Sequence, residues 1–187
     1  YINKTHLNGA KTGDKVVVGN LSWDSSMLNP EGEIIEVYGK AGSVDAEILS
    51  LSREFNLRYK FPKSVLTEAD KISGNISEDE ISNRIDYRDK NVFTIDPDDA
   101  KDFDDALSVE KLEDGNYSIG IHIADVSYYV KKGSALDQES NSRGNSVYFV
   151  GKVIPMLPEK LSNQICSLIP NEDRLTYSVI VQITPRG

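Results

Sequence analysis

Six aspartates gather in one short stretch of the chain, which we call the acidic segment, Asp96–Asp105, and which contains a single lysine. They are Asp96, Asp98, Asp99, Asp102, Asp104 and Asp105. Carboxylates this close repel and raise one another's pKa, so a compensating cation would stabilise them. Hard oxygen ligands favour Mg²⁺, Mn²⁺ or Ca²⁺ over zinc. Apolar residues precede, interrupt and follow the run, namely Ile95, Phe103 and Ala106, and they would anchor it against a core. We therefore favour a metal site over a solvated acidic loop.

The spacing argues against one familiar metal loop and leaves a second chemistry open. An EF-hand loop beginning at Asp96 would require an acidic residue and then glycine at its fifth and sixth positions. The chain has Ala100 and Lys101 there. A strand followed by Asp-x-Asp, here Asp96 and Asp98, is also typical of aspartate-nucleophile phosphatases. Ala100 stands where that pattern calls for Thr or Val, so the phosphatase is the second interpretation.

The elements before the acidic segment change from strand to helix. Short strands are predicted at 15–18 and 33–38, and they are too few to close a barrel. Apolar residues then recur at helical spacing over 44–55, with Ser43 as the N-cap. A second helix is expected at 65–72. Ser77 begins a third, short polar helix with capping-box spacing.

The elements around and after the acidic segment indicate a mixed α/β domain. A buried strand is expected at 92–95, followed by a hairpin of strands 106–112 and 117–126. Isoleucines alternate along the second of these strands, which predicts that it buries their face. Further elements are helices at 134–143 and 159–166 and strands at 148–150 and 177–183. This order is too irregular for a doubly wound sheet.

Composition narrows the class of protein. The chain has 21 basic and 30 acidic residues, a net charge of −9, which argues against coating nucleic acid by bulk electrostatics. No apolar run approaches the ~18 residues of a membrane helix, so we expect no membrane association. The single cysteine, Cys166, suits a reducing cytoplasm and a core position. His122 is expected to be structural.

Several ordered blocks together resemble the ribonuclease II / ribonuclease R family. The strongest is the acidic segment with its flanks, Thr94–Ala106 (TIDPDDAKDFDDA). The others are His122–Val130 (HIADVSYYV), Arg143–Tyr148 (RGNSVY), Ile154–Glu159 (IPMLPE), Leu161–Leu168 (LSNQICSL), and upstream Gly9–Val16 (GAKTGDKV) with Phe61-Pro62. They span nearly the whole chain, which makes a chance match improbable.

The resemblance implies a fold and a domain order. We expect an α+β or mixed chain in which residues 1–62 are the C-terminal part of a cold-shock-like OB domain, a β-barrel. Residues 63–90 would be a helical linker. Residues 91–187 would be the N-terminal part of the ribonuclease catalytic (RNB) domain.

The resemblance also implies an activity and a site. The family is a processive, Mg²⁺-dependent 3′→5′ exoribonuclease, with Mn²⁺ possible, acting on single-stranded RNA and releasing nucleoside 5′-monophosphates. Matched by motif, the catalytic and metal-binding aspartates are Asp96, Asp102, Asp104 and Asp105. Asp98 and Asp99 fall in the variable part of the motif and are expected to be solvated.

Two further residues are assigned to RNA binding. Tyr148 matches the family tyrosine that stacks on the terminal base, with a core aromatic as the alternative. Arg143 is the candidate phosphate contact, although an arginine at a helix C-terminus equally suits packing. We expect a cytoplasmic, monomeric parent enzyme and no activity from these 187 residues alone. A non-catalytic RNA-binding module that keeps the motif is the remaining alternative.

Overall fold

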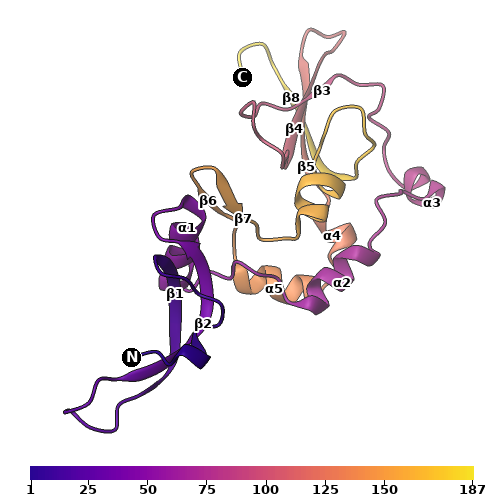
Figure 1. Cartoon of the computed structure of the whole chain (residues 1–187). Helices are drawn as coiled ribbons and strands as arrows, with labels where there is room; N and C mark the ends of the chain where they lie inside the picture. Colours follow the sequence, from indigo (N-terminus) through magenta and orange to yellow (C-terminus); the bar gives the residue numbers. More distant parts are fainter. The chain divides into compact units, whose positions relative to one another are not determined.

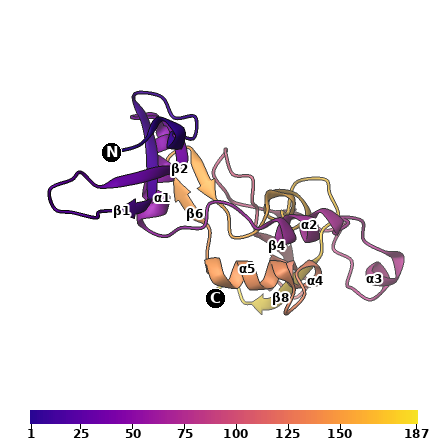
Figure 2. The same cartoon turned by 60° about the horizontal axis from the view of Figure 1, so that its bottom comes forward.

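The computed structural model describes all 187 residues, and the chain divides into two units. Unit 1 contains residues 1–60 and 149–152, and unit 2 contains residues 61–148 and 153–187. Figures 1 and 2 trace the chain through both units. The architecture is mixed α/β without a closed barrel, as the sequence predicts. No helix is long and apolar enough to span a membrane.

Unit 1 is an antiparallel pair of strands with one helix. A 3₁₀ turn at Lys4–His6 (η1) precedes β1 (Asp14–Ser22), which pairs with β2 (Glu31–Lys40), and α1 (Val44–Glu54) follows. Ser43 caps α1 by accepting a hydrogen bond from the N–H of Ala46, as predicted.

The apolar stripe predicted for α1 is only partly buried. Ile48 is buried, but Val44 and Phe55, which share its predicted stripe, are 69% and 67% exposed. Ala46 and Ser52 are the other buried positions of the helix. The helix therefore turns a narrower and less apolar face inward than its spacing suggests.

Unit 2 is built on a four-stranded antiparallel sheet in the order β3-β4-β5-β8. Its strands are β3 (Val92–Phe93), β4 (Asp105–Lys111), β5 (Tyr117–Ala124) and β8 (Thr176–Ile183). The predicted hairpin is present, because β4 and β5 pair directly around a turn in which Gly115 adopts a positive φ of 84°. A glycine meets that backbone requirement without a steric penalty.

The remaining elements are helices of unit 2 and a small hairpin whose residues 149–152 belong to unit 1, and most of the helices follow local capping signals. Ser77 and Ser134 cap their helices through side-chain oxygens, and Gly144 ends one with a φ of 79°. Two elements escaped the sequence prediction, the short helix α4 and the strand β7. The elements are α2 (Lys63–Lys71), α3 (Glu78–Ser82), α4 (Val126–Tyr129), α5 (Ala135–Arg143), β6 (Val147–Phe149), β7 (Lys152–Ile154) and a π-helical turn, η2 (Leu161–Ile165).

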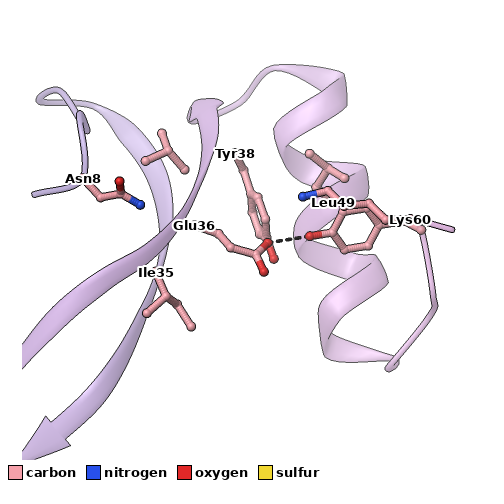
Figure 3. A pocket seen from close by; sticks show the side chains of 8 residues that line it. Asn8, Ile35, Glu36, Tyr38, Leu49 and Lys60 are labelled. Carbon is pink, nitrogen blue, oxygen red and sulfur yellow. Dashed lines mark hydrogen bonds between the residues drawn. The ribbon is translucent and has the colours of Figure 1, made fainter. Parts of the chain in front are cut away.

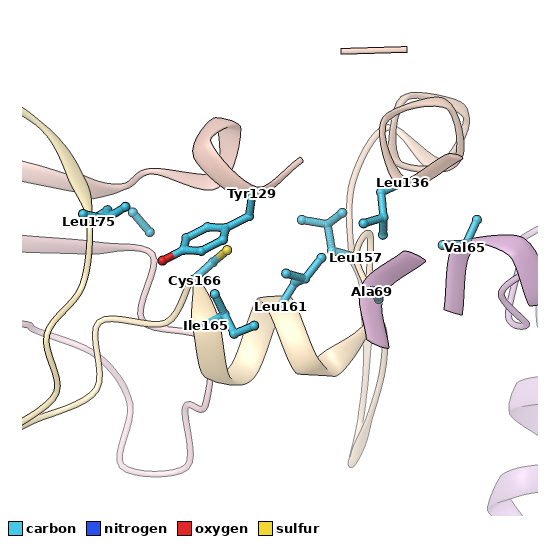
Figure 4. Packing of buried hydrophobic residues seen from close by; sticks show 10 residues of the cluster. Val65, Ala69, Tyr129, Leu136, Leu157, Leu161, Ile165, Cys166 and Leu175 are labelled. Atoms are coloured by element: carbon cyan, nitrogen blue, oxygen red, sulfur yellow. The ribbon is translucent and has the colours of Figure 1, made fainter. Parts of the chain in front are cut away.

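The main core of unit 2 lies among its helices. Figure 4 shows the cluster extending from Leu175 and Tyr129 to Leu136 and Val65. Its members are Val65, Ala69, Ala124, Tyr129, Leu136, Leu157, Leu161, Ile165, Cys166 and Leu175. Two of them lie on α2, so the segment assigned to a linker contributes to this core. Cys166 is a core residue, as predicted, and burial raises its pKa to about 11.

The burial predicted for the sheet is wrong for its apolar face. Phe93, Leu107, Ile121 and Val179 lie in one row across the four strands. Phe93 is 45% and Ile121 41% exposed, and Ile95 beyond β3 is 81% exposed. The buried residues of β5 are Gly120, His122 and Ala124, on the opposite face. Alternation predicted the strand correctly, but which face is covered depends on what packs against it.

His122 joins three strands on the buried face. Its ring nitrogens contact the hydroxyls of Ser178 on β8 (Nδ1, 2.7 Å) and Ser108 on β4 (Nε2, 2.9 Å). Tyr87 packs edge-on against the ring at 5.0 Å between centroids. His122 is 3% exposed, and burial lowers its pKa. The residue is structural, as predicted.

We predict that the stability of the chain decreases as the pH falls below about 6.5. The folded protein keeps His122 neutral there, whereas the unfolded chain, with a histidine pKa of 6.5, takes up a proton and is favoured. Urea unfolding at about pH 7.5 and about pH 5.5 measures the difference. His122→Gln should reduce this pH dependence, and an equal dependence in wild type and variant would contradict the assignment to His122.

Candidate active site

The acidic segment connects β3 to β4 at one end of the sheet of unit 2. Asp105 is the first residue of β4 and lies opposite Ile123 on β5. One residue earlier, the carbonyl oxygen of Asp104 accepts a hydrogen bond from the N–H of Ala124 at 2.9 Å. The end of β5 therefore holds the last two aspartates in position.

Of the four aspartates that the family resemblance selects, Asp104 is affected by the negative charges of the other three. The pKa of Asp104 is raised, first by its removal from water and then by the negative charges of Asp102, Asp105 and Asp96. Asp98 and Asp99 are exposed and contribute nothing to that shift. The charges that act on Asp104 thus come from the three other aspartates of the motif.

The donor set suits a hard divalent cation. The Oδ2 atom of Asp96 is buried and has no hydrogen-bond partner, and a buried carboxylate oxygen left this way is costly. No three His, Cys, Asp or Glu side chains converge closely enough to hold a metal ion as they stand. Carboxylate oxygens are ligands that Mg²⁺ and Mn²⁺ prefer, and a bound cation would offset the repulsion among them. The remaining ligands of the ion would be water molecules and substrate phosphates, as is usual for Mg²⁺.

Tyr148 lies beside the acidic segment. It is on β6, its side chain is 64% exposed, and its hydroxyl donates a 2.8 Å hydrogen bond to Oδ2 of Asp102. That bond, followed by burial, raises the pKa of Tyr148. In this structure Tyr148 is not a core aromatic, and its ring is open to a stacking partner.

Arg143 requires a correction. Its side chain is 4% exposed, and its Nε donates to Oε1 of Glu139 at 3.0 Å. Nη1 donates to the carbonyl of Pro155 at 3.2 Å, and the guanidinium lies 3.7 Å from the ring centroid of Phe61. These contacts enclose the group within unit 2, so the geometry favours the packing alternative over a phosphate contact.

An ion pair that sequence reasoning missed fixes the turn after β5. Asp125, whose side chain is 2% exposed, accepts a 2.7 Å bond from Nη2 of Arg84. It also caps α4 by accepting from the N–H of Tyr128, while its own N–H donates to the carbonyl of Leu175. The residue lies in the block His122–Val130, but neither its burial nor its partner could be read from the sequence.

Unit 1 contains a pocket of about 370 Å³ that includes no residue of the acidic segment. The hydroxyl of Tyr59 donates a 2.5 Å hydrogen bond to the carboxylate of Glu36, which Figure 3 shows lining the pocket beside Tyr38. Burial and that neighbouring carboxylate raise the pKa of Tyr59. Tyr38 lines the same pocket, whereas Trp23 is 66% exposed and donates to the carbonyl of Leu28.

Comparison with known proteins identifies the family. The RNB domain family matches residues 84–187, and the cold-shock domain family matches residues 1–62. Ribonuclease R of Thermotoga maritima is 47% identical over 100% of this chain and 27% of its own length. The chain therefore belongs to the ribonuclease R family of RNB-domain proteins. It does not belong with the phosphatases considered from the sequence.

Solved structures agree with the fold. Mycoplasma genitalium RNase R, in complex with double-stranded RNA, superimposes with a TM-score of 0.84 at 27% identity, over 98% of this chain and 33% of that chain. Yeast Ssd1, a pseudonuclease, gives a TM-score of 0.61 at 21% identity over 91% of this chain and 21% of its own, a likeness of fold alone. The chain thus spans 27% and 33% of the lengths of these two ribonuclease R proteins.

We predict that Arg84→Met destabilises the chain by about 3 kcal/mol, because it leaves the buried carboxylate of Asp125 without its ionic partner. Arg88→Met is the matched control. Arg88 pairs with Asp86 at 2.6 Å, but both side chains are about half exposed, so its loss should destabilise the chain much less than the loss of Arg84. Chemical unfolding of both variants measures the difference, and equal losses would refute the assigned role of Asp125.

Proposed function

We propose that this chain carries the metal-binding core of a processive 3′→5′ exoribonuclease that hydrolyses single-stranded RNA to nucleoside 5′-monophosphates. The observation that carries the proposal is the group of four interacting aspartates at the end of the sheet, including the unpartnered oxygen of Asp96. Membership of an RNB-domain family supports it. A cytoplasmic, monomeric enzyme remains our expectation for the full-length protein.

The aspartates would hold Mg²⁺, or Mn²⁺ in its place. Asp102, Asp104 and Asp105 would approach from the loop and the start of β4, and Asp96 from the end of β3. When bound, such ions activate the attacking water and stabilise the leaving 3′ oxygen. Because carboxylates have to be ionised to bind a cation, metal uptake would increase as the pH rises, and the raised pKa of Asp104 would shift that increase to higher pH.

Tyr148 would receive the terminal base. Its ring is exposed, and its hydroxyl is anchored to Asp102, which would place a stacked base next to the carboxylates. Stacking on an aromatic ring is tolerant of sequence, as an enzyme that acts on varied RNA requires. The chain's own contribution to RNA affinity would be small, since its charge is −9 and the phosphate-binding surfaces would lie elsewhere.

A second candidate is a non-catalytic RNA-binding module that keeps the fold. The likeness of fold to the pseudonuclease Ssd1 gives this alternative a specific basis. The two candidates differ in whether the four carboxylates perform chemistry, and a conservative change at one of them distinguishes the two.

We predict that Asp104→Asn in the full-length protein containing this chain abolishes hydrolysis of single-stranded RNA and leaves RNA binding nearly intact. The carboxylate would serve the metal and the transition state, while affinity depends on phosphate contacts elsewhere. Mononucleotide release and RNA affinity, measured on the same preparation, test this. Asp98→Asn is the control and should remain active. A wild-type protein that binds RNA without degrading it would favour the second candidate.

A further prediction concerns Tyr148→Ala in the same protein. Loss of the ring removes ~1–3 kcal/mol of stacking energy, so short RNA would no longer be held at the site. The variant should therefore leave longer end products. Tyr148→Phe retains the ring and should retain the wild-type product ladder. If both variants give that ladder, the stacking role is wrong.

A further inference from the structure

Ser167 holds the backbone of the acidic segment from inside unit 2. Its side chain has 0% exposure, and its Oγ accepts a hydrogen bond from the N–H of Phe103 at 2.9 Å. The same hydroxyl donates to the carbonyl of Lys101 at 2.9 Å. Next to it, the N–H of Leu168 donates to the carbonyl of Phe103, also at 2.9 Å. Three bonds thus join residues 167–168 to the two residues on either side of Asp102.

The hydroxyl is suited to this position because it acts as donor and acceptor at once. Alanine at this site would leave a partly buried N–H and C=O without partners. Ser167 is itself held, since Nε of Arg174 donates to its carbonyl at 2.9 Å and to that of Gln164 at 3.1 Å. The bonds therefore tie the acidic segment to the turn that follows η2 and not to a mobile side chain.

The two central aspartates of the site are fixed by different means. Asp104 is bound to the sheet through the N–H of Ala124. Asp102 lies in the loop before the strand, where its flanking peptides are bound by Ser167 and its carboxylate by Tyr148. The distance between the two carboxylates thus depends on Ser167 as well as on the sheet.

We propose that Ser167 is a positioning residue that sets the placement of Asp102 relative to Asp104 and so tunes the affinity of the site for divalent metal. This inference rests on the metal site of the proposed function. Residues behind metal ligands commonly change metal affinity when they are replaced, although they do not touch the ion. Ser167 acts in this way through the main chain.

The experiment compares Ser167→Ala with Ser52→Ala in the present chain. Ser52 is a matched control: it also has 0% exposure and makes a buried hydrogen bond, to the carbonyl of Ile48 at 2.7 Å, but it lies on α1 in unit 1. Mn²⁺ affinity is measured by electron paramagnetic resonance, well below the unfolding temperature of each variant. Amide hydrogen exchange of Phe103 is followed on the same samples.

Ser167→Ala should weaken Mn²⁺ binding about tenfold and accelerate exchange of the Phe103 amide about tenfold. Ser52→Ala should change neither. A general loss of stability would lower the unfolding temperature of both variants without a selective loss of Mn²⁺ affinity. Unchanged affinity in Ser167→Ala, or an equal loss in both variants, would overturn the proposal.

The variant Asp104→Asn distinguishes an incorrect positioning role for Ser167 from an incorrect metal site. If Asp104→Asn weakens Mn²⁺ binding but Ser167→Ala does not, the metal site stands and the positioning role is wrong. If Asp104→Asn has no effect on Mn²⁺ binding, the metal site itself is wrong and this inference is overturned with it.

Discussion

Repulsion among the carboxylates of the acidic segment is the constraint on which the arrangement of unit 2 depends. Like charges this close tend to move apart, and they raise the pKa of Asp104 further after its removal from water has raised it. Uncharged contacts from distant parts of the chain offset this tendency. Ala124 on β5 and Ser167 after η2 bind its backbone, and Tyr148 on β6 binds one carboxylate. Much of the unit thus serves to keep like charges together.

Local signals predicted the elements well, and burial was predicted poorly. Ser43 and Ser77 cap helices where expected because a capping bond spans only three residues. The isoleucine face of β5 shows the opposite case. Its period correctly indicated a strand, but the face that is covered carries Gly120 and His122. Periodicity reports which side chains share a face, whereas burial depends on residues far away in the sequence.

The same contrast between local and long-range information applies to the candidate site. The four aspartates were selected by a family motif that lies within one short segment, and the other three contribute to the raised pKa of Asp104. The packing of Arg143 could not be read from the sequence because its partners, Glu139, Pro155 and Phe61, come together only in the fold. Ser167 went unnoticed because a serine in an uncharged run has no chemical signature until its two backbone partners are seen.

The close packing around His122 affects how a mutational scan of this protein should be read. A Cβ at Gly120 would lie 2.3 Å from Oγ of Ser108 and 2.5 Å from Nε2 of His122, closer than real atoms approach. Even alanine would therefore require the buried side chains of Ser108 and His122 to move. A screen scored only by loss of activity would therefore rank Gly120 with the aspartates. Measuring protein abundance beside activity would separate a residue that does chemistry from one that leaves room for its neighbours.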